Sequence, residues 1–140
     1  MSSSAARALP ALVFLWAGIC ISGNLVAAPA KFTVEGLDLP LALQVGRAQF
    51  AWIGALELAA LAALALICLT TRRLPAALAL AALLFAVQQL GLQPMLEARS
   101  DAIIAGGPYT PSRLHLAFVA LEGTKVALLL WTGWGAMAHR

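Results

Sequence analysis

Three ionisable residues, Glu57, Glu122 and Lys125, lie inside long apolar stretches of this sequence. A charged side chain at the centre of a bilayer costs roughly 2.5 to 3.5 kcal/mol even on the mildest scale, so buried charges need partners or a wet cavity. Two carboxylates and an amine at one depth can neutralise one another, or hold a proton, a cation or a polar ligand. We therefore predict a functional centre at these residues, with polar contacts that only hold the helices together as the alternative.

The elements that must carry these residues are membrane helices. The chain has 140 residues, of which 62% are hydrophobic and 11% charged, and this balance leaves no room for a soluble domain. Four apolar runs are each long enough to cross a bilayer, which takes roughly 20 helical residues; they cover residues 9–28, 48–69, 74–92 and 114–136. Strand-like alternation is absent and residues 55–69 are mostly Ala and Leu, which favours helices over a barrel. We predict an all-α, polytopic membrane four-helix bundle in which residues 1–140 form a single integral membrane domain.

The first run also imitates a secretory signal. Arg7 precedes an apolar core, and Ala28-Pro29-Ala30 resembles a small-residue cleavage site. The apolar stretch is longer than the roughly 7 to 15 residues of such a core, and Asn24 interrupts it before the cut. We expect an uncleaved first helix, with cleavage of residues 1–30 as the alternative.

Charge in the loops predicts the orientation. The short link between the second and third spans carries Arg72 and Arg73 and no acid, as cytoplasmic loops do. Four spans then place both termini in the cytoplasm, where Arg7 and the tail His139-Arg140 agree. The two outer loops carry as many basic residues but balance them with acids. The formal charge of +3 is therefore a sidedness signal of a bacterial inner-membrane protein, and nothing suggests nucleic acid.

An internal repeat is visible when positions 65 residues apart are compared, as Glu57 and Glu122 are. The matching pairs are Arg7 and Arg72, Pro10 and Pro75, Pro29 and Pro94, and Asn24 and Gln89. Matches of Ala and Leu are common in such a chain, so chance similarity stays open beside a true duplication. A duplication would give two parallel helix-pair repeats about an axis along the membrane normal, an arrangement known in transporters.

Helical spacing assigns the polar residues to two faces. On the fourth span one face carries His115, Phe118, Glu122 and Lys125, and on the second Arg47, Phe50, Gly54 and Glu57 repeat the same intervals. At about 1.5 Å per residue, the three charged residues lie about 12 to 16 Å below the outer ends of their spans. Asn24, Gln88, Gln89 and Gln93 occupy the outer halves of the other two spans.

Together these residues predict a polar funnel that opens outward and is floored by the glutamates. The predicted ligand-binding residues are Glu57, Glu122, Lys125, His115, Arg47, Asn24 and Gln89. His115 is equally explained as a polar residue at a helix start. The segment 94–112 is predicted to leave the membrane and to form a short interfacial helix over residues 96–105.

No catalytic, metal or cofactor site is predicted. The two histidines lack ligand spacing, and no nucleophile or phosphate-binding motif is present. Cys20 and Cys68 lie at different depths, too far apart for a disulfide, and are expected to pack as small apolar residues.

Three classes of function remain open. The favoured hypothesis is binding or transport of a small polar or ionic ligand or a proton, by a homo-oligomer or with a partner membrane subunit in the lipid bilayer. A structural or assembly subunit is the second hypothesis. An intramembrane enzyme that acts on a lipid or isoprenoid, with a glutamate as general acid or base, is the third.

Four scattered patterns carry a family resemblance: Asn24-x-x-x-x-Pro29-x-x-Phe32, Gly46-Arg47-x-x-Phe50, Pro94 with Arg99, and Arg113-Leu114-His115. In these patterns the sequence resembles small bacterial membrane proteins related to the transmembrane protein 205-like family. The resemblance implies a four-helix membrane protein without an established activity, and it adds little about chemistry.

Overall fold

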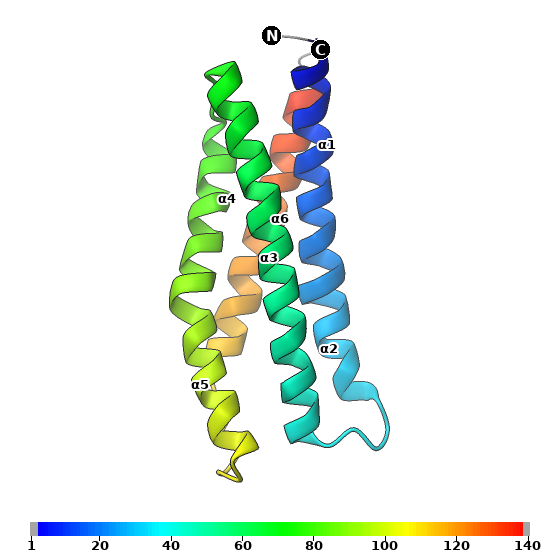
Figure 1. The fold of residues 1–140 in the computed structure, drawn as a ribbon, viewed down its shortest axis with the longest axis vertical. Helices are drawn as coiled ribbons and strands as arrows, with labels where there is room; N and C mark the ends of the chain where they lie inside the picture. Colours follow the sequence, from blue (N-terminus) through cyan, green and yellow to red (C-terminus); the bar gives the residue numbers. More distant parts are fainter. Residues whose placement is uncertain (1–2, 139–140) are drawn as a thin grey trace.

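The computed structural model describes residues 3–138, which form four long helical spans that run side by side (Figure 1). The spans cover Arg7–Thr33, Leu39–Thr71, Ala76–Ile104 and Leu114–Ala138. Each is long and apolar enough to cross a membrane. The predicted all-α four-helix bundle is therefore confirmed, and its architecture is that of a multi-pass membrane protein.

Two of the spans are interrupted by π-helical segments. The first span consists of α1 (Ser3–Cys20), the π-helix η1 (Ile21–Ala27), α2 (Ala28–Ala30) and a short 3₁₀ turn, η2 (Lys31–Thr33). The third consists of α4 (Ala76–Val87), the π-helix η3 (Gln88–Leu92) and α5 (Gln93–Ile104). The second and fourth spans are the single helices α3 (Leu39–Thr71) and α6 (Leu114–Ala138).

The helix ends follow local capping chemistry. α3 begins nine residues before its predicted apolar run, because the Asp38 carboxylate accepts a hydrogen bond from the Leu41 amide at 2.8 Å and caps the helix. Ser112 Oγ likewise accepts from the Leu114 amide at 3.1 Å at the start of α6. The helix predicted over 96–105 is present in α5, but it is continuous with the third span and not a separate element. α5 ends at Ile104, and Gly106 follows with a φ of +90°.

The two ends of the bundle differ. The start of α1, the end of α6 and the link between α3 and α4 lie at one end, which we call the terminal end (top of Figure 1). The links 34–38 and 105–113 lie at the other, which we call the open end. Arg72 and Arg73 are in the terminal-end link, while His139 and Arg140 lie outside the described residues.

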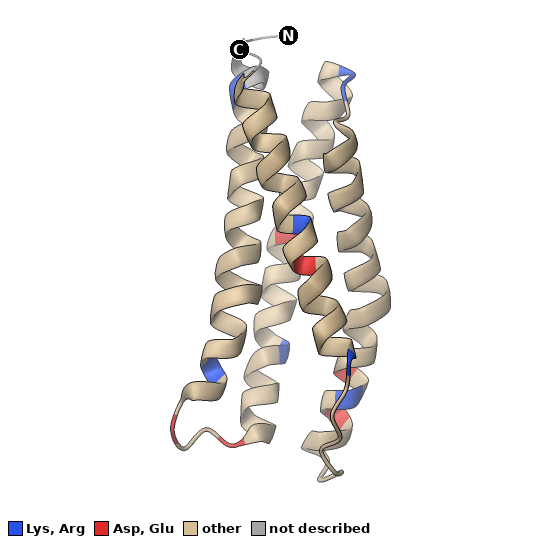
Figure 2. Cartoon of the chain, turned by 180° about the vertical axis from the view of Figure 1, so that it is seen from behind, with Lys and Arg blue, Asp and Glu red and all other residues tan. Residues whose placement is uncertain are grey.

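An apolar core fills the terminal half of the bundle. It includes the fully buried Val13, Trp16, Leu64 and Leu129, and the Trp16 ring meets Phe85 edge-on with 6.1 Å between centroids. Large apolar side chains also cover the outside of the bundle, where they suit contact with lipid; the most exposed are Trp52, Leu69, Leu90, Trp131 and Trp134. Charged residues therefore gather at the two ends, except for one group halfway along the bundle (Figure 2).

Candidate functional site

The group halfway along the bundle is a network of buried polar side chains built around Glu57 of α3. The Glu57 carboxylate is 1% exposed and accepts hydrogen bonds from side chains of two other spans. Trp16 Nε1 donates at 2.8 Å, Cys20 Sγ at 3.3 Å and Asn24 Nδ2 at 3.3 Å, all from the first span. Lys125 Nζ donates at 2.5 Å from α6. Four donors thus surround one carboxylate.

Glu122 of α6 is the second carboxylate of the network and has no exposed surface. Asn24 Nδ2 donates to its Oε1 at 2.9 Å, so a single amide bridges the two glutamates. Gln88 Nε2 donates to its Oε2 at 2.8 Å from the third span. All four spans therefore contribute to one centre.

Lys125 is the one cation of this network and is 1% exposed. Its ammonium lies 3.0 Å from Glu122, one helical turn away on α6, and donates to Gln88 Oε1 at 2.9 Å. The Phe85 ring lies 5.5 Å from Nζ and adds a cation–π contact. With all three groups ionised, two carboxylates and one ammonium leave one formal negative charge in a place that excludes water.

The π-helical segments place Asn24 and Gln88 in the network. In a regular α-helix a proline offers no N–H to the carbonyl four residues earlier, and its ring clashes with that carbonyl. The wider π-helical turn before the proline relieves this clash. Pro29 and Pro94 both follow a π-helix by two residues, and these prolines are 65 positions apart. The two interrupted spans thus share an unusual local structure at matching positions, as a duplication predicts.

The structure brings together four of the seven predicted ligand-binding residues: Glu57, Glu122, Lys125 and Asn24. Gln89 does not join them. Its side-chain amide packs against Gly54, where a methyl group would lie 3.0 Å from Nε2, and its neighbour Gln88 enters the network instead.

Sequence reasoning missed two donors of the network, Trp16 and Cys20. Both precede Asn24 at intervals of four, so all three side chains lie on one face of the first span. That spacing was the signal for them. Cys20 therefore contacts a carboxylate rather than only filling apolar space, and both Cys20 and Cys68 are free thiols.

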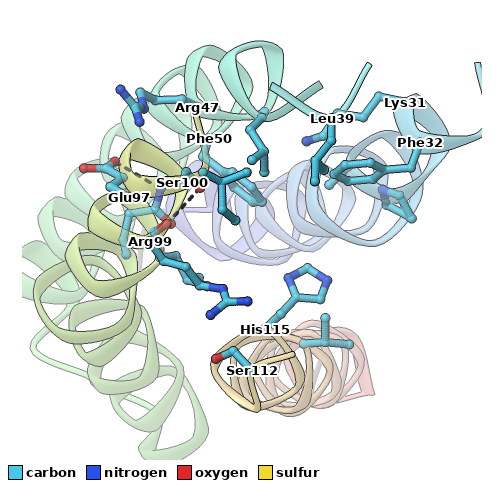
Figure 3. A pocket seen from close by; sticks show the side chains of 18 of the residues that line it. Lys31, Phe32, Leu39, Arg47, Phe50, Glu97, Arg99, Ser100, Ser112 and His115 are labelled. Carbon is cyan, nitrogen blue, oxygen red and sulfur yellow. Dashed lines mark hydrogen bonds between the residues drawn. The ribbon is translucent and has the colours of Figure 1, made fainter. Parts of the chain in front are cut away.

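A cavity of about 640 Å³ lies at the open end of the bundle (Figure 3). All four spans line it, and its wall includes the remaining two predicted residues, Arg47 and His115. Its lining does not include the network, contrary to the funnel floored by glutamates that the sequence predicts. Phe50 lines the cavity and packs edge-on against Phe118, with 5.6 Å between ring centroids. Glu122 lies one turn beyond Phe118, so this aromatic pair stands between cavity and network.

A metal ion is a poor match for the network. One ligand atom from each of Cys20, Glu57 and Glu122 lies within 4.8 Å of the others, a spacing that a cation can use. However, every oxygen of the two carboxylates already accepts a hydrogen bond from a side chain. A metal ion would have to displace these donors, whereas a proton would not.

Comparison of the chain with protein families, curated proteins and solved structures finds no match. The resemblance to the transmembrane protein 205-like family stays a prediction.

Proposed function

We propose that this membrane protein binds or transports a small ligand at its open-end cavity and exchanges a proton at the buried network. The observation that carries the proposal is the imbalance of charge among three ionisable groups that are at most 1% exposed. An uncompensated charge in so dry a place is expensive, and a bound proton is the smallest ligand that removes it.

The contacts favour Glu122 as the group that takes the proton. Glu57 accepts from four side chains, including the closest approach of Lys125, and these donors stabilise its ionised form. Glu122 accepts from two amides and lies farther from the ammonium. Protonation of Glu122 therefore costs less free energy than protonation of Glu57.

Asn24 can serve both protonation states of Glu122. Its Oδ1 is buried and has no hydrogen-bond partner among the described residues, while its Nδ2 donates to Glu122. A half-turn of the amide exchanges the two atoms and gives up the 3.3 Å hydrogen bond to Glu57, which keeps its three other donors. Oδ1 would then accept the hydrogen bond of a protonated Glu122, so the unpartnered acceptor gains a role in the proton-bound state.

The cavity supports access to the network from the open end. It approaches the network as far as the Phe50–Phe118 pair, whereas a packed apolar core fills the bundle on the terminal side. These two rings form the barrier, and a shift of either would admit water toward Glu122. A ligand that binds in the cavity against Phe50 would shift this ring, and ligand binding would thereby control the access of protons to Glu122.

We infer that the terminal end faces the cytoplasm of a bacterial inner membrane, because Arg72 and Arg73 lie in its link without a neighbouring acid. A membrane-impermeant maleimide should then label Thr110→Cys in intact cells and Leu74→Cys only after permeabilisation. Cys20 and Cys68 are buried and give little background. Labelling of Leu74→Cys before Thr110→Cys would reverse the orientation.

Proton flux into vesicles tests the proposed function. We expect vesicles that contain the native protein and a trapped pH indicator to acidify under a potassium diffusion potential faster than protein-free vesicles. Glu122→Gln should reduce the rate to that of protein-free vesicles, because the amide takes up no proton. The variant keeps the size of the side chain and so tests protonation rather than packing.

The matched control is Glu35→Gln, which removes one carboxylate from an exposed position in the open-end link. It should retain the native flux. An undiminished rate in Glu122→Gln would contradict proton exchange at this network. Equal rates for native and protein-free vesicles would show that the apolar core of the terminal half closes the proton's path across the bundle.

A further inference from the structure

Cationic side chains collect in the wall of the open-end cavity. Lys31, Arg47 and Arg99 line it together with His115, and Figure 3 shows the Arg99 guanidinium and the His115 ring on facing sides. The cavity lining contains one carboxylate, Glu97, which accepts a hydrogen bond from Gln93 Nε2 at 3.2 Å. The cavity therefore carries an excess of positive charge.

Two of these cations are held without an acidic partner. Lys31 Nζ lies 5.2 Å and 5.3 Å from the ring centroids of Phe32 and Phe50. The Arg99 guanidinium lies 5.6 Å from the Tyr109 ring and donates to Thr110 Oγ1 at 3.3 Å. Across residues 7–138, neither forms an ion pair with a carboxylate. Aromatic rings and a hydroxyl position these charges but do not neutralise them.

Arg47 adds a donor that is already out of water. One terminal nitrogen of its guanidinium pairs with Asp101, whereas its Nε is buried and has no partner within the described part of the chain. A buried donor without an acceptor is costly and uncommon in folded proteins.

The rest of the wall is apolar. The hydrocarbon side chains that line it are Leu39, Leu43, Leu96, Ile103, Leu116 and Val119. The volume of about 640 Å³ lies within the range of roughly 300 to 1,000 Å³ that small-molecule sites occupy. A small inorganic anion would leave this apolar surface unused, and an uncharged lipid would leave the cations unmatched.

We propose that the cavity binds an amphiphile that has a hydrocarbon chain and an anionic head, either a carboxylate or a phosphate. The head accepts from Lys31 and Arg99, and the chain lies along the leucine-rich wall. This inference identifies the ligand class of the cavity in the proposed function. It uses residues of the cavity and none of the buried network, so the two claims can fail separately.

Titration calorimetry in a neutral detergent tests the inference with four probes that differ in one feature each. Dodecyl phosphate and laurate carry both the chain and an anionic head, dodecanol lacks the charge, and inorganic phosphate lacks the chain. We expect at least one of the two anionic amphiphiles to bind, and dodecanol and inorganic phosphate to bind at least about tenfold more weakly. The tighter of the two amphiphiles identifies the head group.

Variants in the wall then locate the site. Lys31→Gln and Arg99→Gln should each weaken the bound amphiphile about tenfold, since each removes a charge-assisted contact. Arg113→Gln is the matched control, because Arg113 is exposed at the same end but does not line the cavity. It should leave the affinity unchanged.

A substitution that keeps every charge gives an independent check. A methyl group at Gly46 would overlap Lys31 Nζ, the mobile end of a flexible side chain. Gly46→Ala should therefore keep the fold, displace the ammonium and weaken the amphiphile. Equal binding of dodecanol, equal binding of inorganic phosphate, or an equal loss in Arg113→Gln would overturn the proposal. Glu122→Gln should still bind the amphiphile, which separates this test from the test of proton exchange.

Discussion

Replacement of Lys125 with methionine is expected to destabilise the protein by roughly 3 to 5 kcal/mol, the cost of removing one partner from a buried ion pair. Methionine nearly matches the length of lysine, so the loss is electrostatic rather than a cavity. Without the ammonium, Glu57 and Glu122 would lie almost fully buried with no cation between them. The Gln88 oxygen would lose its donor as well.

Unfolding of the purified variant in mixed micelles measures this loss as a change in the free energy of unfolding. Arg47→Met is the matched control, because it removes a cation from the partly exposed pair with Asp101, and such pairs contribute only about 0 to 1 kcal/mol. Addition of Glu57→Gln to the Lys125→Met variant removes one of the two buried carboxylates and should recover part of the lost free energy of unfolding. Equal stabilities of the Lys125 and Arg47 variants would show that the network charges do not hold the bundle together.

The second large effect is expected on proton binding. Glu122→Gln leaves Glu57 and Lys125 as a neutral pair, so the network should lose its bound proton completely. The glutamine amide can also imitate the protonated acid, since its N–H can donate to Asn24 Oδ1 once the asparagine has turned. We therefore expect a folded variant with no protonated carboxyl group, in contrast to Lys125→Met, in which both carboxyl groups should be protonated.

The fold could be predicted well because hydropathy and length determine how many times a chain crosses a membrane. The helix ends could not, since they depend on local contacts outside the apolar runs. α3 starts at its Asp38 cap, and the third span continues as α5 through a segment that includes Glu97, Arg99 and Asp101. Hydropathy registers only the apolar part of a helix, so it ended the third span at residue 92.

The candidate site could be predicted at those residues whose burial in a membrane costs the most free energy. The cost of a charge in hydrocarbon marked Glu57, Glu122 and Lys125, and their joint depth indicated one centre. The choice between Gln88 and Gln89 was not predictable from the repeat, because η1 has seven residues and η3 has five. Wider π-helical turns rotate the following side chains, so the residue that aligns with Asn24 in sequence is not the one that meets Glu122.

Helical periodicity also explains why the cavity and the network were predicted as one feature. Equal spacing on the second and fourth spans placed Arg47 and His115 above the two glutamates on the same faces. Helical periodicity predicts which residues share one face of a helix. It does not predict which side chains pack between two positions along that face. The Phe50–Phe118 pair occupies that level and divides the predicted funnel into an amphipathic cavity and a buried proton site.

Infrared spectroscopy of the purified protein in neutral buffer tests the proton on the buried network most directly, through the C=O stretching band of protonated carboxyl groups. We predict one such group per molecule in the native protein, none in Glu122→Gln and two in Lys125→Met. A native spectrum without this band, or a band of native intensity in Glu122→Gln, would contradict a proton held by Glu57, Glu122 and Lys125.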